Sequence, residues 1–141
     1  MANQRKDELS LRLRIPAERC FLSNALLTLD GICDHYCFSE CSRDRIKKAL
    51  ETALIGSINL SYQKAPGLFD LQFSVFKDRI TIAVEDFLIT ETATSAEIVA
   101  NSDSIKQMLG DIEDMTDGIT FIDKKGRNAC YSMDFCVESI L

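Results

Sequence analysis

Apolar and polar side chains alternate strictly in several short runs, and this pattern predicts β-strands. Residues 9–15 read Leu-Ser-Leu-Arg-Leu-Arg-Ile, a period of two that is typical of a strand with one buried face, which ends at Pro16. Four further runs alternate in the same way and pair into two hairpins, residues 68–76 with 79–87 and residues 119–122 with 128–135. The first hairpin turns on two residues, Lys77 and Asp78.

Apolar residues recur at helical spacing in three other segments. These segments are residues 17–37, residues 43–62 and residues 102–115. Ser42 is a candidate N-cap for the second helix, and Ser102 or Asp103 for the third. Small residues in the apolar stripe of the second helix would let a neighbouring element approach closely. Residues 88–101 are polar, and their pattern favours neither a helix nor a strand.

The order of these elements is strand, helix, helix, hairpin, helix and hairpin. It predicts an α+β fold, a two-layer sandwich in which a mostly antiparallel five-stranded sheet has three helices on one face. The chain has 141 residues, 46% of them hydrophobic, so it can bury the core of one domain without disulfides or metal ions. We therefore expect a flexible N-terminus over residues 1–8 and a single domain over residues 9–141.

The formal net charge of -6 narrows the classes of function. An acidic chain lacks the basic surface that phosphate contacts require, so we do not expect nucleic-acid binding. No apolar run is long enough to cross a membrane and no export signal is visible, so we expect a cytoplasmic protein without a membrane partner. In that compartment the six cysteines are expected to stay reduced.

Several short motifs occur along the chain in a fixed order. They are Arg14-Ile15-Pro16-Ala17 after the first strand, the Leu-x-x-x-Gly pattern from Leu27 to Gly31, Tyr62 at the end of the second helix, and Phe76-Lys77-Asp78-Arg79 followed by an alternating run that ends in Asp86. This ordered set resembles the bacterial anti-sigma factor serine kinases, which have the smallest form of the histidine-kinase-like ATPase (GHKL) fold. The resemblance covers residues 9–135, and it implies the same sandwich with the sheet order of that family.

The resemblance also implies a nucleotide site, in which a Glu and an Asn four residues apart on the second helix act as general base and magnesium ligand. Neither of two registers supplies that pair here: the positions are Thr52 and Gly56 when the helix is aligned on Tyr62, and Glu51 and Ile55 when it is aligned on Glu51. Asn59 lies one further turn along the helix. Because magnesium needs oxygen ligands, neither Gly56 nor Ile55 can replace the Asn.

In the family, an Asp at the end of the hairpin reads the adenine base, and a glycine-rich loop covers the phosphates. Asp86 matches that Asp, but the glycine that should follow it is missing, and no glycine occurs between Gly67 and Gly110. Backbone that approaches a phosphate closely needs residues without a Cβ. We therefore predict a degenerate nucleotide site, with Asp86 and Asn59 as its remaining nucleotide-binding candidates.

Three cysteines are spaced at helical intervals around the end of the first predicted helix. Cys33, Cys37 and Cys41 lie four residues apart, with His35 between the first two. A metal or redox site is one interpretation, but zinc needs four ligands at tighter spacing. The other interpretation, which we favour, is that these are small buried side chains and a helix terminus. Their spacing alone does not assign them a role, and we expect no metal site.

Taken together, the sequence favours a partner-switching regulatory protein that resembles anti-sigma factors and acts by protein binding, without a cofactor. The implied partner is a sigma factor or an anti-sigma-antagonist domain, bound by the helical face or by the edge strand over residues 9–15. An exposed edge strand also leaves a homodimer open. The alternative is an active ATP-dependent serine/threonine protein kinase that uses ATP and Mg²⁺, with Glu51 as the base and Asp86 at the adenine. A third reading is an unrelated α+β protein.

Overall fold

The computed structural model describes residues 9–61, 67–88, 107–123 and 129–138, and it contains one sheet. The five strands are β1 (Leu9–Pro16), β2 (Gly67–Phe76), β3 (Arg79–Leu88), β4 (Gly118–Asp123) and β5 (Ala129–Cys136). They lie in the order β1-β2-β3-β5-β4, and every neighbouring pair is antiparallel. The predicted five-stranded sheet is therefore confirmed.

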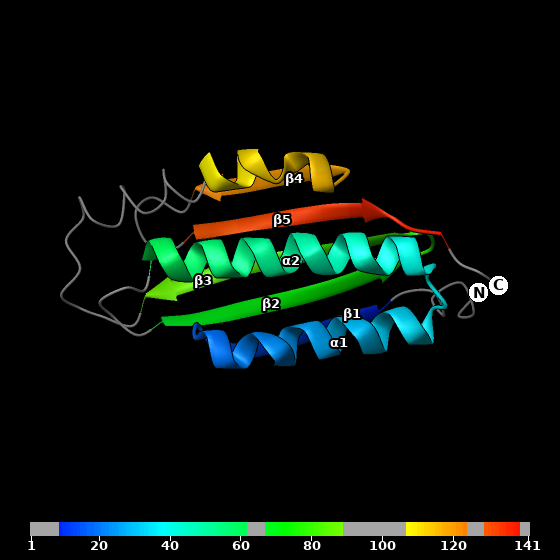
Figure 1. Cartoon of the computed structure of the whole chain (residues 1–141), viewed down its shortest axis with the longest axis horizontal. Coiled ribbons are helices and arrows are strands. Elements are labelled where there is room, and N and C mark those ends of the chain that lie inside the picture. Colours follow the sequence, from blue (N-terminus) through cyan, green and yellow to red (C-terminus); the bar gives the residue numbers. More distant parts are fainter. Residues whose placement is uncertain (1–8, 62–66, 89–106, 124–128, 139–141) are drawn as a thin grey trace.

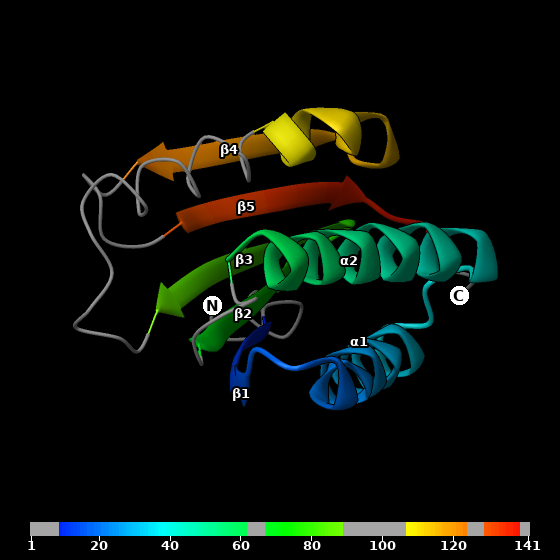
Figure 2. The same cartoon turned by 60° about the vertical axis from the view of Figure 1, so that its left-hand side comes forward.

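The helices lie together on one face of this sheet, as the two views in Figures 1 and 2 show. The helical elements are a short 3-10 helix η2 (Arg19–Phe21), α1 (Leu22–His35), α2 (Glu40–Ser61), a third helical segment over residues 107–111, and the 3-10 helix η3 (Glu113–Met115). This arrangement confirms the predicted two-layer α+β sandwich. No helix in the described part of the chain is long and apolar enough to cross a membrane.

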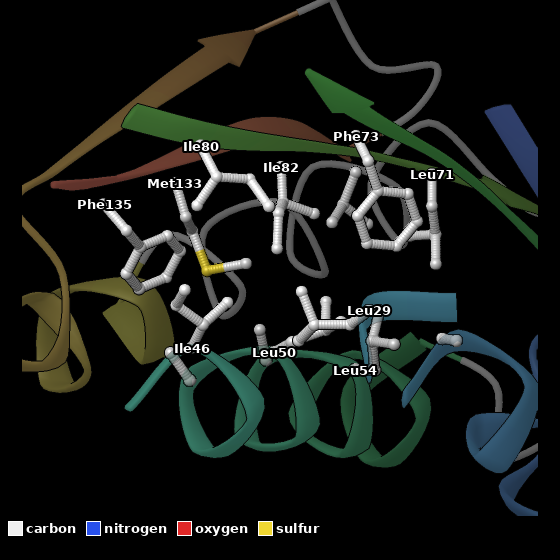
Figure 3. Packing of buried hydrophobic residues seen from close by; sticks show 14 of the residues in the cluster. Leu29, Ile46, Leu50, Leu54, Leu71, Phe73, Ile80, Ile82, Met133 and Phe135 are labelled. Atoms are coloured by element: carbon white, nitrogen blue, oxygen red, sulfur yellow. The ribbon is translucent and has the colours of Figure 1, made fainter. Parts of the chain in front are cut away.

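The core fills the space between the sheet and the helices. Side chains from β2, β3 and β5 point toward α1 and α2, as Figure 3 shows, and these contacts exclude water completely. The labelled members are Leu29, Ile46, Leu50, Leu54, Leu71, Phe73, Ile80, Ile82, Met133 and Phe135. Burying each such side chain stabilises the fold by roughly 1.5–3 kcal/mol, so this single layer carries most of the hydrophobic stabilisation.

The first hairpin has the two-residue link that the sequence predicts. Phe76 pairs with Arg79, and Lys77 takes a left-handed conformation with φ 56°. Two-residue hairpin links favour such positive φ values, because they match the twist of the flanking strands. The register of the hairpin places the following buried side chains toward the helices: Phe69, Leu71, Phe73 and Val75 of β2, and Ile80, Ile82 and Val84 of β3.

The helix predicted over residues 17–37 begins later than expected. The backbone N–H of Ala17 donates to the carbonyl of Gly67 at 2.9 Å, which extends the pairing of β1 with β2 by one residue. The chain therefore stays extended through Glu18, passes through η2, and enters α1 at Leu22. Helical spacing in the sequence cannot reveal this hydrogen bond, because its acceptor is remote in the chain.

The start of α2 corrects a second expectation, because Ser39 rather than Ser42 caps the helix. The backbone N–H of Ser42 donates to Ser39 Oγ at 3.2 Å, and the helix begins at Glu40. The Ser42 hydroxyl instead accepts from the backbone N–H of Glu138 at 3.3 Å, while the Ser39 N–H donates to the Glu138 carbonyl at 2.7 Å. The segment after β5 thus binds the N-terminus of α2.

Candidate functional site

Gly56 lies on α2 where the side chain of Met108, from the third helical segment, rests against the helix. A Cβ added to Gly56 would lie 3.0 Å from Met108 Cγ and 3.1 Å from both Cε and Sδ. These distances are shorter than ordinary van der Waals contact, so a side chain fits at this position only if Met108 moves. Gly56 is also the position that matches the magnesium-binding Asn when the helix is aligned on Tyr62.

The other polar candidates on α2 face solvent. The Glu51 side chain is exposed, and so is Asn59, whose Oδ1 accepts a hydrogen bond from Arg19 Nη2 at 2.9 Å. The two residues are eight positions apart, which corresponds to about 12 Å along a helix. Ile55, the ligand position of the second register, packs against the core instead. The structure therefore does not bring Glu51 and Asn59 together.

Asp86, the adenine candidate, has a described backbone in β3. It pairs with Phe69 of β2 and Ala129 of β5, and it stands two residues beyond the buried Val84. Its side chain lies outside the described residues, as does most of the segment over residues 88–103 in which the family resemblance places the phosphate lid. The role of Asp86 stays a prediction.

The three cysteines near the α1–α2 connection have different surroundings. Cys33 is fully buried, and burial raises the pKa of its thiol from 9.0 to about 11, so it stays protonated at neutral pH. Cys37 has φ 55°, and the bonds Cys37 N–H to Asp34 O and Phe38 N–H to Cys33 O form the Schellman motif that ends α1. Cys41 is exposed in the first turn of α2.

These positions support the interpretation of a buried side chain and a helix terminus. Among the described residues, no group of three or more His, Cys, Asp and Glu side chains could hold a metal ion.

Charged side chains join α1 to α2 beside these cysteines. Lys47 Nζ donates to Asp30 Oδ2 at 3.2 Å, and Arg43 pairs with both Asp34 and Asp30. The hydrogen bond from Arg43 to Asp34 raises the pKa of the guanidinium. The cluster fixes the two helices relative to one another, so we assign it a structural role.

The face of the sheet that carries no helix is polar, and it carries a cluster of charged side chains beside β1. Arg12 Nη2 and Arg14 Nη2 both contact Asp70 Oδ2, at 3.2 and 3.1 Å. The arginine side chains are 70% and 61% exposed, whereas Asp70 is 6% exposed because they cover it. Asp70 also lies directly opposite Glu85 in the β2–β3 register. Since like charges in such a pair repel, the two arginines stabilise this row of the sheet.

Sequence reasoning did not find two features of the structure, the Arg-Asp cluster on the sheet and the contact between Met108 and Gly56. The Arg-Asp cluster has a visible signal, since Asp70 is the charged residue within β2 and two arginines alternate in β1, but their contact depends on the register of β1 with β2. The contact of Met108 with Gly56 had a weaker signal in the small residues of α2. The position of the third helical segment decides it, and no local pattern predicts that position.

Comparison with known proteins yields one curated relative of note, and no protein-family profile matches the chain. The relative is the serine-protein kinase RsbW of Oceanobacillus iheyensis, which is 27% identical over 77 residues. The match covers 54% of this chain and 49% of the relative, so it spans about half the length of each. This similarity supports the resemblance to anti-sigma factor serine kinases, and the sandwich fold agrees with it.

Proposed function

We propose that this protein is a cytoplasmic regulator of the anti-sigma type that acts by binding another protein, and that its nucleotide site is degenerate. Its partner would be a sigma factor or an anti-sigma-antagonist domain. The family resemblance and the similarity to a serine-protein kinase support the regulatory role. The contact between Gly56 and Met108 carries the second part of the proposal.

The argument from this contact is chemical. A magnesium ligand at position 56 would need a side-chain oxygen, but Gly56 has no side chain, and the space beside its Cα is taken by a methionine. A thioether is a soft ligand that does not suit magnesium, which prefers hard oxygen atoms. The metal that normally neutralises the phosphates would therefore have no protein anchor on this helix. Without it, the triphosphate would lose most of its electrostatic stabilisation.

Aligning the helix on Glu51 instead of Tyr62 also leaves the magnesium ion without a ligand. Aligning the helix on Glu51 puts the partly buried Ile55 at the ligand position, and a hydrocarbon offers no lone pair. Asn59 Oδ1 accepts a hydrogen bond from the positively charged Arg19, which competes with a metal ion for that oxygen. Both registers thus support a role in binding rather than in phosphoryl transfer.

Calorimetry with ATP and Mg²⁺ tests the proposal. We expect a dissociation constant weaker than about 1 mM, which corresponds to a binding free energy near -4 kcal/mol. Binding at micromolar affinity that is lost in Asp86→Asn would overturn the degenerate-site reading. It would favour the alternative, an active serine/threonine protein kinase with Glu51 as base.

The partner is best identified by affinity capture from the native cell, with the proteins identified by mass spectrometry. Recovery of a sigma factor or of an anti-sigma-antagonist domain would support the proposal. A homodimer through the edge of β1 is a further arrangement to test, by light scattering of the purified chain. Monomeric behaviour at high concentration would exclude it.

A further inference from the structure

The strand β1 forms an edge of the sheet and carries an unusual set of side chains for an edge. Within the described residues it pairs with β2 alone, so its second row of backbone N–H and C=O groups faces outward. An edge of this kind is a template for another strand. Its length, Leu9–Pro16, is enough to pair with an extended segment of about eight residues.

The side chains on the two faces of β1 determine which residue types a segment bound at this edge needs on each of its faces. Toward the helices, Leu9, Leu11 and Leu13 are only partly buried, so an added strand with apolar residues on this face would complete their burial. On the open face stand Arg12 and Arg14, both largely exposed. A guanidinium has five N–H donors, so one bond to Asp70 leaves Arg12 with further donors for a carboxylate.

A second copy of this chain fits the edge poorly. Antiparallel β1–β1 pairing that keeps the leucines on the helix side must put even-numbered residues opposite one another. The two longest such registers place Arg12 opposite Arg12 or opposite Arg14. Like charges directly opposite in a sheet repel. The other edge, β4, presents Gly118 and Thr120 at the open-face positions, so it does not supply carboxylates either.

We propose that the free edge of β1 docks an extended segment of a partner protein in which apolar and acidic residues alternate. Backbone hydrogen bonds supply the affinity, and acidic side chains paired with Arg12 and Arg14 supply the register. The Arg12 and Arg14 guanidinium groups are exposed and the Asp70 carboxylate that they contact is buried, so the arginines present positive charge where an acidic segment would bind. The inference rests on the proposed function, because it names the chemistry of the bound partner.

Fluorescence anisotropy with three labelled ten-residue peptides tests this inference on the full chain. One peptide alternates Val and Glu, the second alternates Val and Lys, and the third is the Val-Glu peptide with a central Pro that removes a backbone donor. We expect binding of the first peptide alone, and binding that weakens as ionic strength rises. Arg12→Gln and Arg14→Gln should each weaken it about tenfold, because each removes a charge-assisted contact. Lys48→Gln, an exposed site on α2, is the matched control and should leave it unchanged.

One further measurement tests the binding site without relying on a variant. Amide chemical shifts of the wild-type chain should change along β1 when the Val-Glu peptide is added, and this readout does not depend on a variant that folds poorly. Equal binding of the Val-Lys peptide, or shifts confined to the helices, would overturn the inference, as would a wild-type dimer that buries β1. ATP is absent from these assays, so their failure leaves the degenerate-site proposal to its own calorimetric test.

Discussion

The contact between Gly56 and Met108 predicts that two glycines in helices will respond differently to the same substitution. Gly31 lies in α1, and a Cβ added there would meet no atom within 4 Å. Gly56 lies in α2, where the added Cβ would meet three atoms of Met108 at 3.0–3.1 Å. Replacing each glycine by alanine therefore separates the intrinsic preference of a helix for alanine from the cost of the contact.

The expected magnitudes follow from these distances. Alanine is favoured over glycine inside a helix by about 1 kcal/mol, so Gly31→Ala should stabilise the protein by about that amount. Inserting a methyl group into a packed site costs about 1–3 kcal/mol, and the flexible thioether of Met108 places this site near the lower end. Gly56→Ala should therefore be neutral, or destabilising by about 1 kcal/mol.

Urea unfolding followed by circular dichroism measures both effects, with Met108→Ala as the background that removes the obstacle. In that background Gly56→Ala should become stabilising, which gives a coupling free energy of about 1–2 kcal/mol between the two sites. If Gly56→Ala stabilised the wild-type protein as much as Gly31→Ala does, Met108 would not rest on Gly56. The structural argument for an obstructed ligand position would then fail.

Three other predictions concern single groups. Cys37→Gly should stabilise the protein to urea by about 0.5–1 kcal/mol, because glycine adopts the positive φ at the end of α1 without steric cost. Cys33 should resist thiol reagents in the folded state, while Cys41 reacts at once. Since the pKa of Cys33 is raised from 9.0 to about 11, the stability it contributes should be lost as pH rises through that range. Asp117→Asn should reduce the amount of stability that the protein loses below about pH 4. The Cys136 N–H lowers the pKa of the Asp117 carboxyl, so the carboxylate stabilises the fold fully only above the ordinary Asp pKa.

Each of these has a matched control. Cys41→Gly, inside the first turn of α2, should destabilise the helix, and a gain there would show that the effect at position 37 is not conformational. Rapid modification of Cys33 by a thiol reagent in the native protein would contradict its burial. Asp111→Asn, at an exposed position, should leave the acid limb of the pH profile unchanged, and an equal effect there would remove the special role of Asp117.

The sequence predicts the sheet well, because the period of two is set locally and each strand buries one face. The link of Lys77 and Asp78 also sets the register of the first hairpin without any tertiary information. The ends of the helices were less predictable. Ser39 stands just before α2 and Ser42 lies in its first turn, and the bonds of Glu138, which is remote in sequence, decide which of them caps the helix.

In the candidate site, too, some features follow from local sequence and others depend on contacts between remote residues. The residues of α2 alone predict the loss of the magnesium ligand, because that prediction requires only an alignment. That Met108 lies beside the empty position depends on how the third helical segment packs, and no periodicity encodes it. Likewise, the alternation of arginines in β1 is a local pattern, but their shared carboxylate comes from a strand 56 to 58 residues later in the chain.

Two junctions in the strand order β1-β2-β3-β5-β4 are not made by hairpins: β1 pairs with β2 although α1 and α2 separate them in the chain, and β3 pairs with β5 although β4 lies between them in the chain. The segment between β3 and β5 includes η3 and the strand β4, and the pairing of Asp86 with Ala129 holds its two ends together. The entropy of closing such a loop grows only logarithmically, so doubling its length costs about 0.6 kcal/mol. Insertions or deletions in residues 89–106 would therefore leave the sheet nearly untouched. The framework of the sheet can thus stay constant while the connection between β3 and the third helical segment changes in length and composition.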